Sequence, residues 1–129
     1  MQDSIFTKII KGEIPAYKIY ENDKVIAFLD IHPEMPGHTL VVPKIQVDKF
    51  YDLPDEDYQA LFAAVKKIAA HMENILGERT LVKIIGVDVP HAHVHLFPAD
   101  PTKSPAEAPQ AASADLAAMA QKLQMKSAD

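Results

Sequence analysis

The longest regular hydrophobic pattern in the chain lies between residues 55 and 76. Apolar residues recur there every three to four positions, as they do on one face of an amphipathic α-helix. They are Tyr58, Leu61, Phe62, Val65, Ile68, Ala69, Met72, Ile75 and Leu76. Asp52 or Asp55 is a candidate N-cap, and Gly77 stands where a glycine ends a helix. The pattern therefore predicts one long helix.

Shorter segments with alternating or β-branched residues predict strands on both sides of this helix. They are residues 17–21, 24–31, 38–43, 79–87 and 91–98. Asn22-Asp23 joins the first two strands as a tight turn, which gives an antiparallel meander. A short helix is predicted over residues 4–11 with Ser4 as its N-cap. One long helix on a mostly antiparallel sheet is an α+β arrangement, and this is the fold class that we expect.

The composition changes after Pro98. Residues 99–109 hold three prolines in eleven positions, which predicts a loop or arm. Residues 113–126 are rich in alanine and predict a helix with a thin apolar face. We therefore divide the chain into a domain at residues 1–98 and a Pro/Ala-rich arm and helix at residues 99–129. We expect the arm and helix to pack on the domain or on a partner subunit.

Composition limits the class of protein. The 129 residues suit a single domain, and 48% hydrophobic with 24% charged residues is ordinary for a soluble globular protein. A net charge of −5 without a basic run argues against a nucleic-acid partner. The chain has no cysteine, which fits a reducing compartment. No apolar run approaches the roughly 20 residues that cross a bilayer, so we expect a cytoplasmic protein with no membrane partner.

The most informative stretch is His91-Ala92-His93-Val94-His95, which holds three of the six histidines. At the two-residue period of a strand, these imidazoles share one face. Imidazole titrates near neutrality, so one ring can attack or accept a proton while its neighbours donate. A zinc site is the first alternative, although the three histidines of an extended strand span about 13 Å, which strains convergence on one ion. Packing alone is the second alternative.

This triad and three upstream motifs resemble the histidine triad (HIT) family. The motifs are IFTKIIKGEIPA at residues 5–16, Leu29-Asp30-Ile31, and PGHTLVVPK at residues 36–44. The similarity covers residues 4–98 and is to the branch of nucleoside phosphoramidases and hydrolases that release adenosine monophosphate. The resemblance implies a five-stranded antiparallel sheet with one long helix, and a homodimer that continues this sheet.

The resemblance also implies roles for individual residues. His93 would attack the α-phosphorus and form a nucleotidyl-histidine intermediate. His91 and His95 would orient and polarise the phosphate oxygens, and His38 would be a supporting fourth histidine. Asp30 would accept hydrogen bonds from the ribose hydroxyls, because a carboxylate accepts more than once.

Further positions either extend the expected nucleotide site or depart from the family pattern. Residues expected to line an apolar slot for the purine are Phe6, Ile9, Phe28 and Ile31. Asp88 stands at the expected rim, where the family often has a serine that helps to protonate the leaving group. Gln46 replaces a histidine that usually follows the Pro-Lys pair. The connection at residues 85–90 is also shorter than is usual in this branch.

The function that we expect is nucleotide hydrolysis or nucleotidyl transfer at an α-phosphate. The substrates would be purine nucleoside phosphoramidates, dinucleoside polyphosphates or adenylated compounds, with no cofactor and no metal. The alternative is a nucleotide-binding interaction protein with little turnover, which the short connection before His91 favours. A metalloprotein would instead retain stoichiometric zinc through dialysis.

Overall fold

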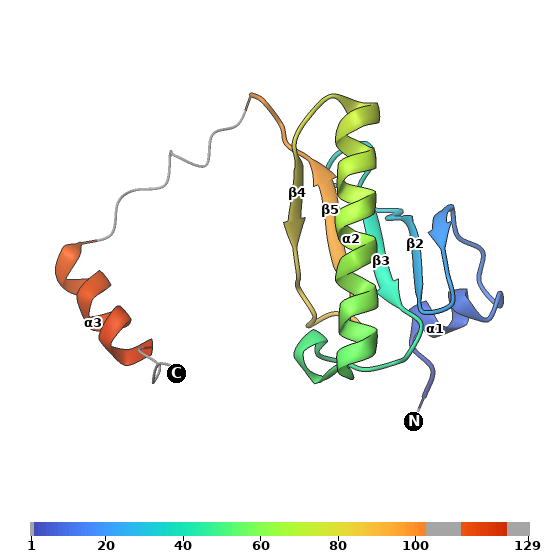
Figure 1. The fold of residues 1–129 in the computed structure, drawn as a ribbon, viewed down its shortest axis with the longest axis horizontal. Helices are drawn as coiled ribbons and strands as arrows, with labels where there is room; N and C mark the ends of the chain where they lie inside the picture. The colour runs from blue at the N-terminus through green and yellow to red at the C-terminus, as the bar shows by residue number, and fades with distance from the viewer. Residues whose placement is uncertain (1, 103–111, 124–129) are drawn as a thin grey trace.

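A five-stranded antiparallel sheet with one long helix across it forms the domain (Figure 1). The computed structural model describes residues 2–102 and 112–123. The strands are β1 (Lys18–Glu21), β2 (Val25–Leu29), β3 (Thr39–Pro43), β4 (Thr80–Lys83) and β5 (Val94–Pro98). Their order across the sheet is β1-β2-β3-β5-β4, so β1 and β4 are its edges. The α+β prediction is confirmed.

The long helix α2 (Asp55–Leu76) has the predicted ends. Gly77 follows it in the left-handed conformation, with φ +79°, and its N–H donates to the Glu73 carbonyl. The predicted N-cap is wrong, because Pro54 occupies that position and no side chain caps the helix. Asp52 belongs instead to the short 3-10 helix η1 (Phe50–Asp52). Three acidic residues in the first turn of α2 complement the helix dipole.

The alternation along each strand divides the buried residues into two clusters, one on each face of the sheet. The larger cluster packs against α2 and includes Val25, Ala27, Val41, Ala92, Val94 and Leu96 with Leu61, Val65, Ile68 and Met72 of the helix. The smaller cluster packs against the short helix α1 (Ile5–Ile10) and contains Ile26, Phe28, Leu40 and Val42 with Phe6. As predicted, Ser4 caps α1, and its side chain accepts from the Thr7 N–H.

The histidine segment straddles the start of β5. The ladder between β4 and β5 runs from Thr80↔Pro98 to Lys83↔His95, so both strands are shorter than predicted. His91 and His93 precede β5, in a stretch where the Ala92 N–H donates to the Val47 carbonyl at 2.7 Å. Residues 84–90 therefore leave the sheet and turn back beside the histidines.

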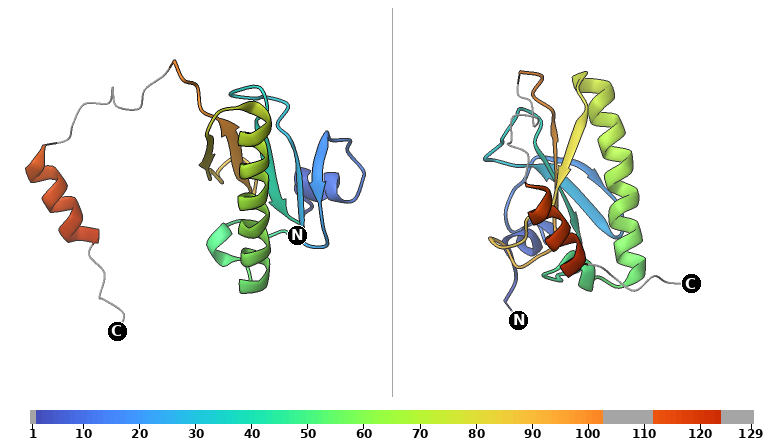
Figure 2. Two further views of the ribbon diagram at one scale, coloured as in Figure 1. Left: turned by 45° about the horizontal axis from the view of Figure 1, so that its top comes forward. Right: turned by 90° about the vertical axis from the view of Figure 1, so that its left-hand side faces the viewer.

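The C-terminal helix α3 (Ser113–Leu123) stands apart from the sheet (Figure 2). Its described side chains are exposed, including those of Leu116 and Met119. The last three residues of the predicted helix, 124–126, lie outside the described residues, and its packing on the domain or a partner stays a prediction. Among the described helices, none has the length and apolar character that a membrane span requires.

Candidate functional site

A cavity of about 300 Å³ opens between α1 and the sheet. Its lining includes all the residues predicted to bind a nucleotide: Phe6, Ile9, Phe28, Asp30, Ile31 and Asp88. His93 and His95 also line this cavity. The fold thus brings together residues from α1, β2, the loop after β2, and the histidine segment.

The sequence analysis did not predict the cavity-lining residues that follow α1 in the chain. Pro15, Ala16 and Tyr17 line the same cavity, as does Val89 just before the triad. A signal was present, because residues 14–16 belong to the motif that carries the family resemblance. His32 also lines the cavity and is exposed.

His93 is only 2% exposed, and its orientation is fixed by the backbone. Its Nδ1 lies 2.7 Å from the His91 carbonyl oxygen, which only accepts, so the ring proton is on Nδ1. In the neutral tautomer that this bond selects, Nε2 carries the free lone pair. The Asp88 carboxylate lies 4.0 Å from Nε2. The Phe6 ring packs edge-on against the imidazole, with 4.9 Å between centroids.

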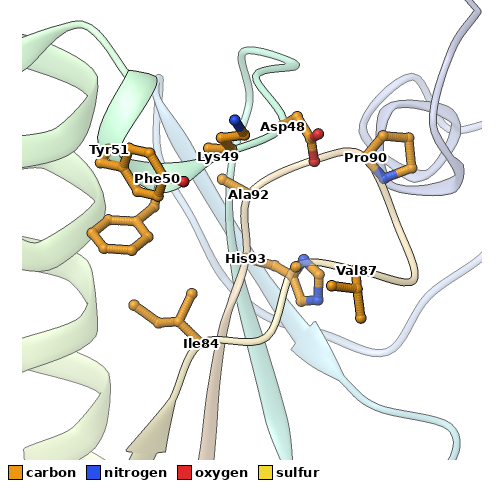
Figure 3. Close-up of a pocket in the computed structure, with 10 residues that line it drawn as sticks. Asp48, Lys49, Phe50, Tyr51, Ile84, Val87, Pro90, Ala92 and His93 are labelled. Atoms are coloured by element: carbon orange, nitrogen blue, oxygen red, sulfur yellow. The ribbon is translucent and has the colours of Figure 1, made fainter. Parts of the chain in front are cut away.

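A second cavity, of about 490 Å³, also borders His93 (Figure 3). Phe50 and Tyr51 lie on its α2 side with Ile84 below them, while Val87 lies beside the His93 ring. Residues 84–90 leave the β4–β5 ladder here, and four of them line this cavity together with His93: Ile84, Gly86, Val87 and Pro90. His93 therefore borders two cavities although it is nearly buried.

His95 and His38 form a hydrogen-bonded pair beside Asp30. The Glu34 N–H donates to His38 Nδ1 at 3.0 Å, so the His38 proton is on Nε2. This Nε2–H donates to His95 Nδ1 at 2.9 Å, which places the His95 proton on its own Nε2. Burial lowers the pKa of His95, the charges of His93, His38 and Lys83 lower it further, and Asp30 opposes them. His95 is therefore a neutral ring that can donate from Nε2.

His91 is fully buried and lines neither cavity. Its Nε2 lies 2.8 Å from the Pro43 carbonyl oxygen, and its Nδ1 lies 2.7 Å from Ser4 Oγ. Burial lowers the pKa of His91, with a smaller contribution from the charge of His93, while the bond to Pro43 acts in the opposite direction. Both nitrogens of this neutral ring are thus used inside the protein.

Comparison with known proteins decides the family. The HIT domain pattern matches residues 11–102. The chain belongs to the HIT family. An uncharacterised HIT-like protein of Methanocaldococcus jannaschii is 41% identical over 101 residues, which cover 73% of this chain and 77% of that protein.

Two further relatives of this HIT protein are informative. The adenosine 5′-monophosphoramidase HNT1 of Saccharomyces cerevisiae is 40% identical over 104 residues, covering 78% of this chain and 65% of that one. The crystal structure of a HIT family member from Bacillus subtilis superposes with a TM-score of 0.77 at 31% identity, covering 98% of this chain and 100% of that one.

The HIT site contains one group of potential metal ligands within the described part of the chain. Asp30, His38 and His95 offer ligand atoms within 4.8 Å of one another. A metal-bound histidine normally donates from its other ring nitrogen. In His38 that nitrogen instead accepts from the Glu34 N–H, so the proton cannot move there and leave Nε2 free for an ion. The group is better suited to hydrogen bonding than to metal binding.

Proposed function

We propose that this HIT protein is a nucleotide hydrolase that cleaves purine nucleoside phosphoramidates or related adenylated compounds through His93. The observation that carries the proposal is the cavity that joins an apolar slot, a carboxylate and the His93 imidazole, whose Nδ1 is held by the His91 carbonyl. The yeast relative named as an adenosine 5′-monophosphoramidase supports the same reaction class.

The cavity suits each part of a nucleotide. Phe6 and Phe28, with ring centroids 5.7 Å apart, and the neighbouring Ile9 and Ile31 offer apolar surface to the base. Asp30 accepts one bond from the His32 N–H at 2.9 Å and has lone pairs left for the two ribose hydroxyls. A nucleotide held in this way would direct its α-phosphate toward the histidines.

In the first step, the Nε2 lone pair of His93 bonds to the α-phosphorus while the bond from phosphorus to the leaving nitrogen breaks. The leaving amine takes up a proton from solvent at the cavity mouth. The imidazole becomes positively charged, and its Nδ1–H keeps its bond to the His91 carbonyl, which stabilises that charge. His95 donates its Nε2–H to a phosphate oxygen as negative charge develops there.

In the second step, water attacks the phosphorus and the bond to His93 Nε2 breaks. The water loses one proton to solvent, AMP is released, and His93 returns to its neutral form. Two displacements at one histidine thus replace a single difficult attack by water.

The alternative function is nucleotide binding with little turnover. The Asp88 carboxylate favours it, because a negative charge 4.0 Å from His93 Nε2 repels an incoming phosphate. However, the Asp88 side chain is 71% exposed, so solvent screens much of this repulsion.

The test is release of AMP from adenosine 5′-phosphoramidate by the native protein, His93→Ala and His71→Ala. We expect turnover by the native protein, a loss of at least ~10³-fold in His93→Ala, and native activity in His71→Ala, whose histidine is exposed on α2. Binding of AMP without turnover by the native protein would favour the alternative. Parallel assays with a dinucleoside polyphosphate and an adenylated amine identify the leaving group.

We also propose a homodimer in which β4 pairs with β4 of a second copy. β4 is an edge strand with unpaired backbone groups, and it exposes 39% of Leu81 and 49% of Val82. Light scattering in solution should give the mass of a dimer, and Val82→Lys should give a monomer. A monomeric native protein would contradict this proposal. Cytoplasmic localisation stays a prediction.

A further inference from the structure

His91 is held in one protonation state by partners from two distant segments. The Pro43 carbonyl can only accept, so His91 Nε2 carries the ring proton and donates it there. Nδ1 is therefore an acceptor, and the Ser4 hydroxyl donates to it at 2.7 Å. The two bonds together define a neutral ring with its proton on Nε2.

Ser4 is in turn held by Gln46 and Thr7. The Ser4 N–H donates to Gln46 Oε1 at 2.8 Å, and the Thr7 hydroxyl donates to the same oxygen at 2.6 Å. The Thr7 N–H donates to Ser4 Oγ at 3.0 Å. Gln46 Nε2 completes the set by donating to the Gln2 carbonyl at 2.9 Å. The directions of the bonds in this Ser4–Gln46 cluster are mutually consistent. Thr7 Oγ1 lies farther from His91 Nδ1 than Ser4 Oγ does, at 3.3 Å against 2.7 Å.

The Ser4–Gln46 cluster reaches His93 by two short routes. The His91 carbonyl accepts from His93 Nδ1–H at 2.7 Å. The position of His91 therefore keeps the proton of the neutral His93 ring on Nδ1. Phe6 lies between Ser4 and Thr7 on α1, lines the cavity, and packs edge-on against the His91 and His93 rings. A displacement of Ser4 would move both the bonded carbonyl and the packed ring.

We infer that Ser4 and Gln46 are positioning residues, which lock His91 as a neutral ring so that its carbonyl keeps His93 Nε2 free and aimed into the cavity. His91 then acts as a support for the nucleophile rather than as a phosphate ligand. The consequence for turnover rests on the proposed function, but the locked state of His91 does not.

The first test is long-range proton–nitrogen NMR of the full chain labelled with heavy nitrogen. We expect His91 to show a protonated Nε2 and an unprotonated, hydrogen-bonded Nδ1 at neutral pH. In Ser4→Ala the Nδ1 resonance should move toward that of a non-bonded nitrogen, and Ser4→Thr, which keeps a hydroxyl, should restore it. A His91 with its proton on Nδ1, or a resonance that Ser4→Ala leaves unchanged, would overturn the inference.

The second test is kinetic and uses the same variants with adenosine 5′-phosphoramidate. Ser4→Ala should lower kcat about 10-fold with a smaller change in KM, and Ser4→Thr should recover most of the loss. Gln46→Ala leaves the bond between Ser4 and His91 in place, so this variant should fold and show a smaller decrease in kcat than Ser4→Ala. The control Ser113→Ala, in exposed α3, should match the native protein.

The two tests separate this inference from the proposed function. An inactive native protein with the expected His91 resonances would contradict the proposed function. It would still support the neutral, hydrogen-bonded state of His91. If the native protein is active and both Ser4→Ala and Gln46→Ala keep the native kcat, the positioning role is wrong.

Discussion

The two faces of the sheet differ in what they bury. The face under α2 is covered along its length by a helix and closed with aliphatic side chains such as Val94, Leu96 and Leu61. The opposite face carries a smaller apolar cluster under α1, and beside it lie the four histidines His38, His91, His93 and His95. The α2 face is therefore apolar along the helix, while the α1 face combines an apolar cluster with histidines and a cavity.

The comparison teaches how one strand can serve both purposes. Because successive side chains alternate, Val94 and Leu96 anchor β5 in the larger core while His95 and the preceding His93 face the cavity. Substitutions on the two faces should consequently separate stability from activity.

The largest effect is expected in the α2 core. Leu61 is fully buried, so Leu61→Ala should lower the free energy of unfolding by about 2–5 kcal/mol through lost transfer energy and a cavity. Below its melting temperature the variant should keep the native kcat, since it leaves the other face untouched. Urea denaturation and the AMP-release assay measure both quantities.

The matched control for that substitution is Ile75→Ala on the same helix. Its side chain is 65% exposed, so the stability change should stay within about 0.5 kcal/mol. If Leu61→Ala and Ile75→Ala lower the free energy of unfolding equally, burial in the core under α2 does not account for the stability of the domain.

The next largest effect is expected on the cavity face, from Asp30→Asn. The amide keeps an oxygen for the His32 N–H but loses the charge that strengthens bonds to ribose hydroxyls. We expect AMP to bind about 10-fold more weakly, with little change in unfolding free energy. Calorimetric titration measures the affinity, and adenine nucleotides lacking one ribose hydroxyl should lose less affinity in the variant than in the native protein.

A smaller effect is expected from Asp88→Asn. Removing the exposed carboxylate near His93 Nε2 should raise kcat/KM for a phosphoramidate by about 2- to 5-fold, because an exposed charge pair contributes less than about 1 kcal/mol. The increase should shrink as salt is added. A decrease in kcat/KM would instead identify Asp88 as a group that assists departure of the amine.

The smallest expected effect is on the pH dependence of stability. Burial lowers the pKa of His91 in the folded state, so the unfolded chain binds this proton more readily. The contribution of the neutral His91 ring to the free energy of unfolding is fully present above about pH 6.5, the ordinary pKa of histidine. This contribution is lost as the pH falls below that value. His95, whose pKa is lowered in the same direction, adds to the loss.

Melting temperatures between about pH 8 and about pH 5.5 measure this dependence. They should fall toward the acidic end, and more steeply in the native protein than in His91→Gln. A melting temperature that rises on acidification over this range would contradict the neutral state of His91.

Much of the fold was predictable because local signals agreed with tertiary packing. The apolar stripe and Gly77 located α2 to the residue, apolar and β-branched runs located β2 and β3, and alternation located β5 although it begins later than predicted. The strand at residues 79–87 was overestimated, because β-branched composition does not reveal that pairing with β5 stops at Lys83. The N-cap of α2 was missed because two candidate aspartates lie near a proline that takes the position.

The cavity lining was predictable where a family-like motif contributed to it, as with Phe6, Asp30 and His93 from three separate motifs. The internal burial of His91 was not, since it depends on Ser4, 87 positions away, and on the Pro43 carbonyl. Gln46 read in sequence only as a departure from the family pattern. Its contacts with Ser4 and Thr7 appear only once the chain has folded.

Capture of the covalent intermediate shows whether His93 is the nucleophile. Native protein is mixed with adenosine 5′-phosphoramidate, quenched in alkali, where a phosphorus–imidazole bond survives, and mapped by peptide mass spectrometry. We expect the added mass of one adenylyl group on His93 and on no other histidine. The same mass on His91 or His95, or rapid AMP release with no adduct in a quenched-flow time course, would contradict this expectation.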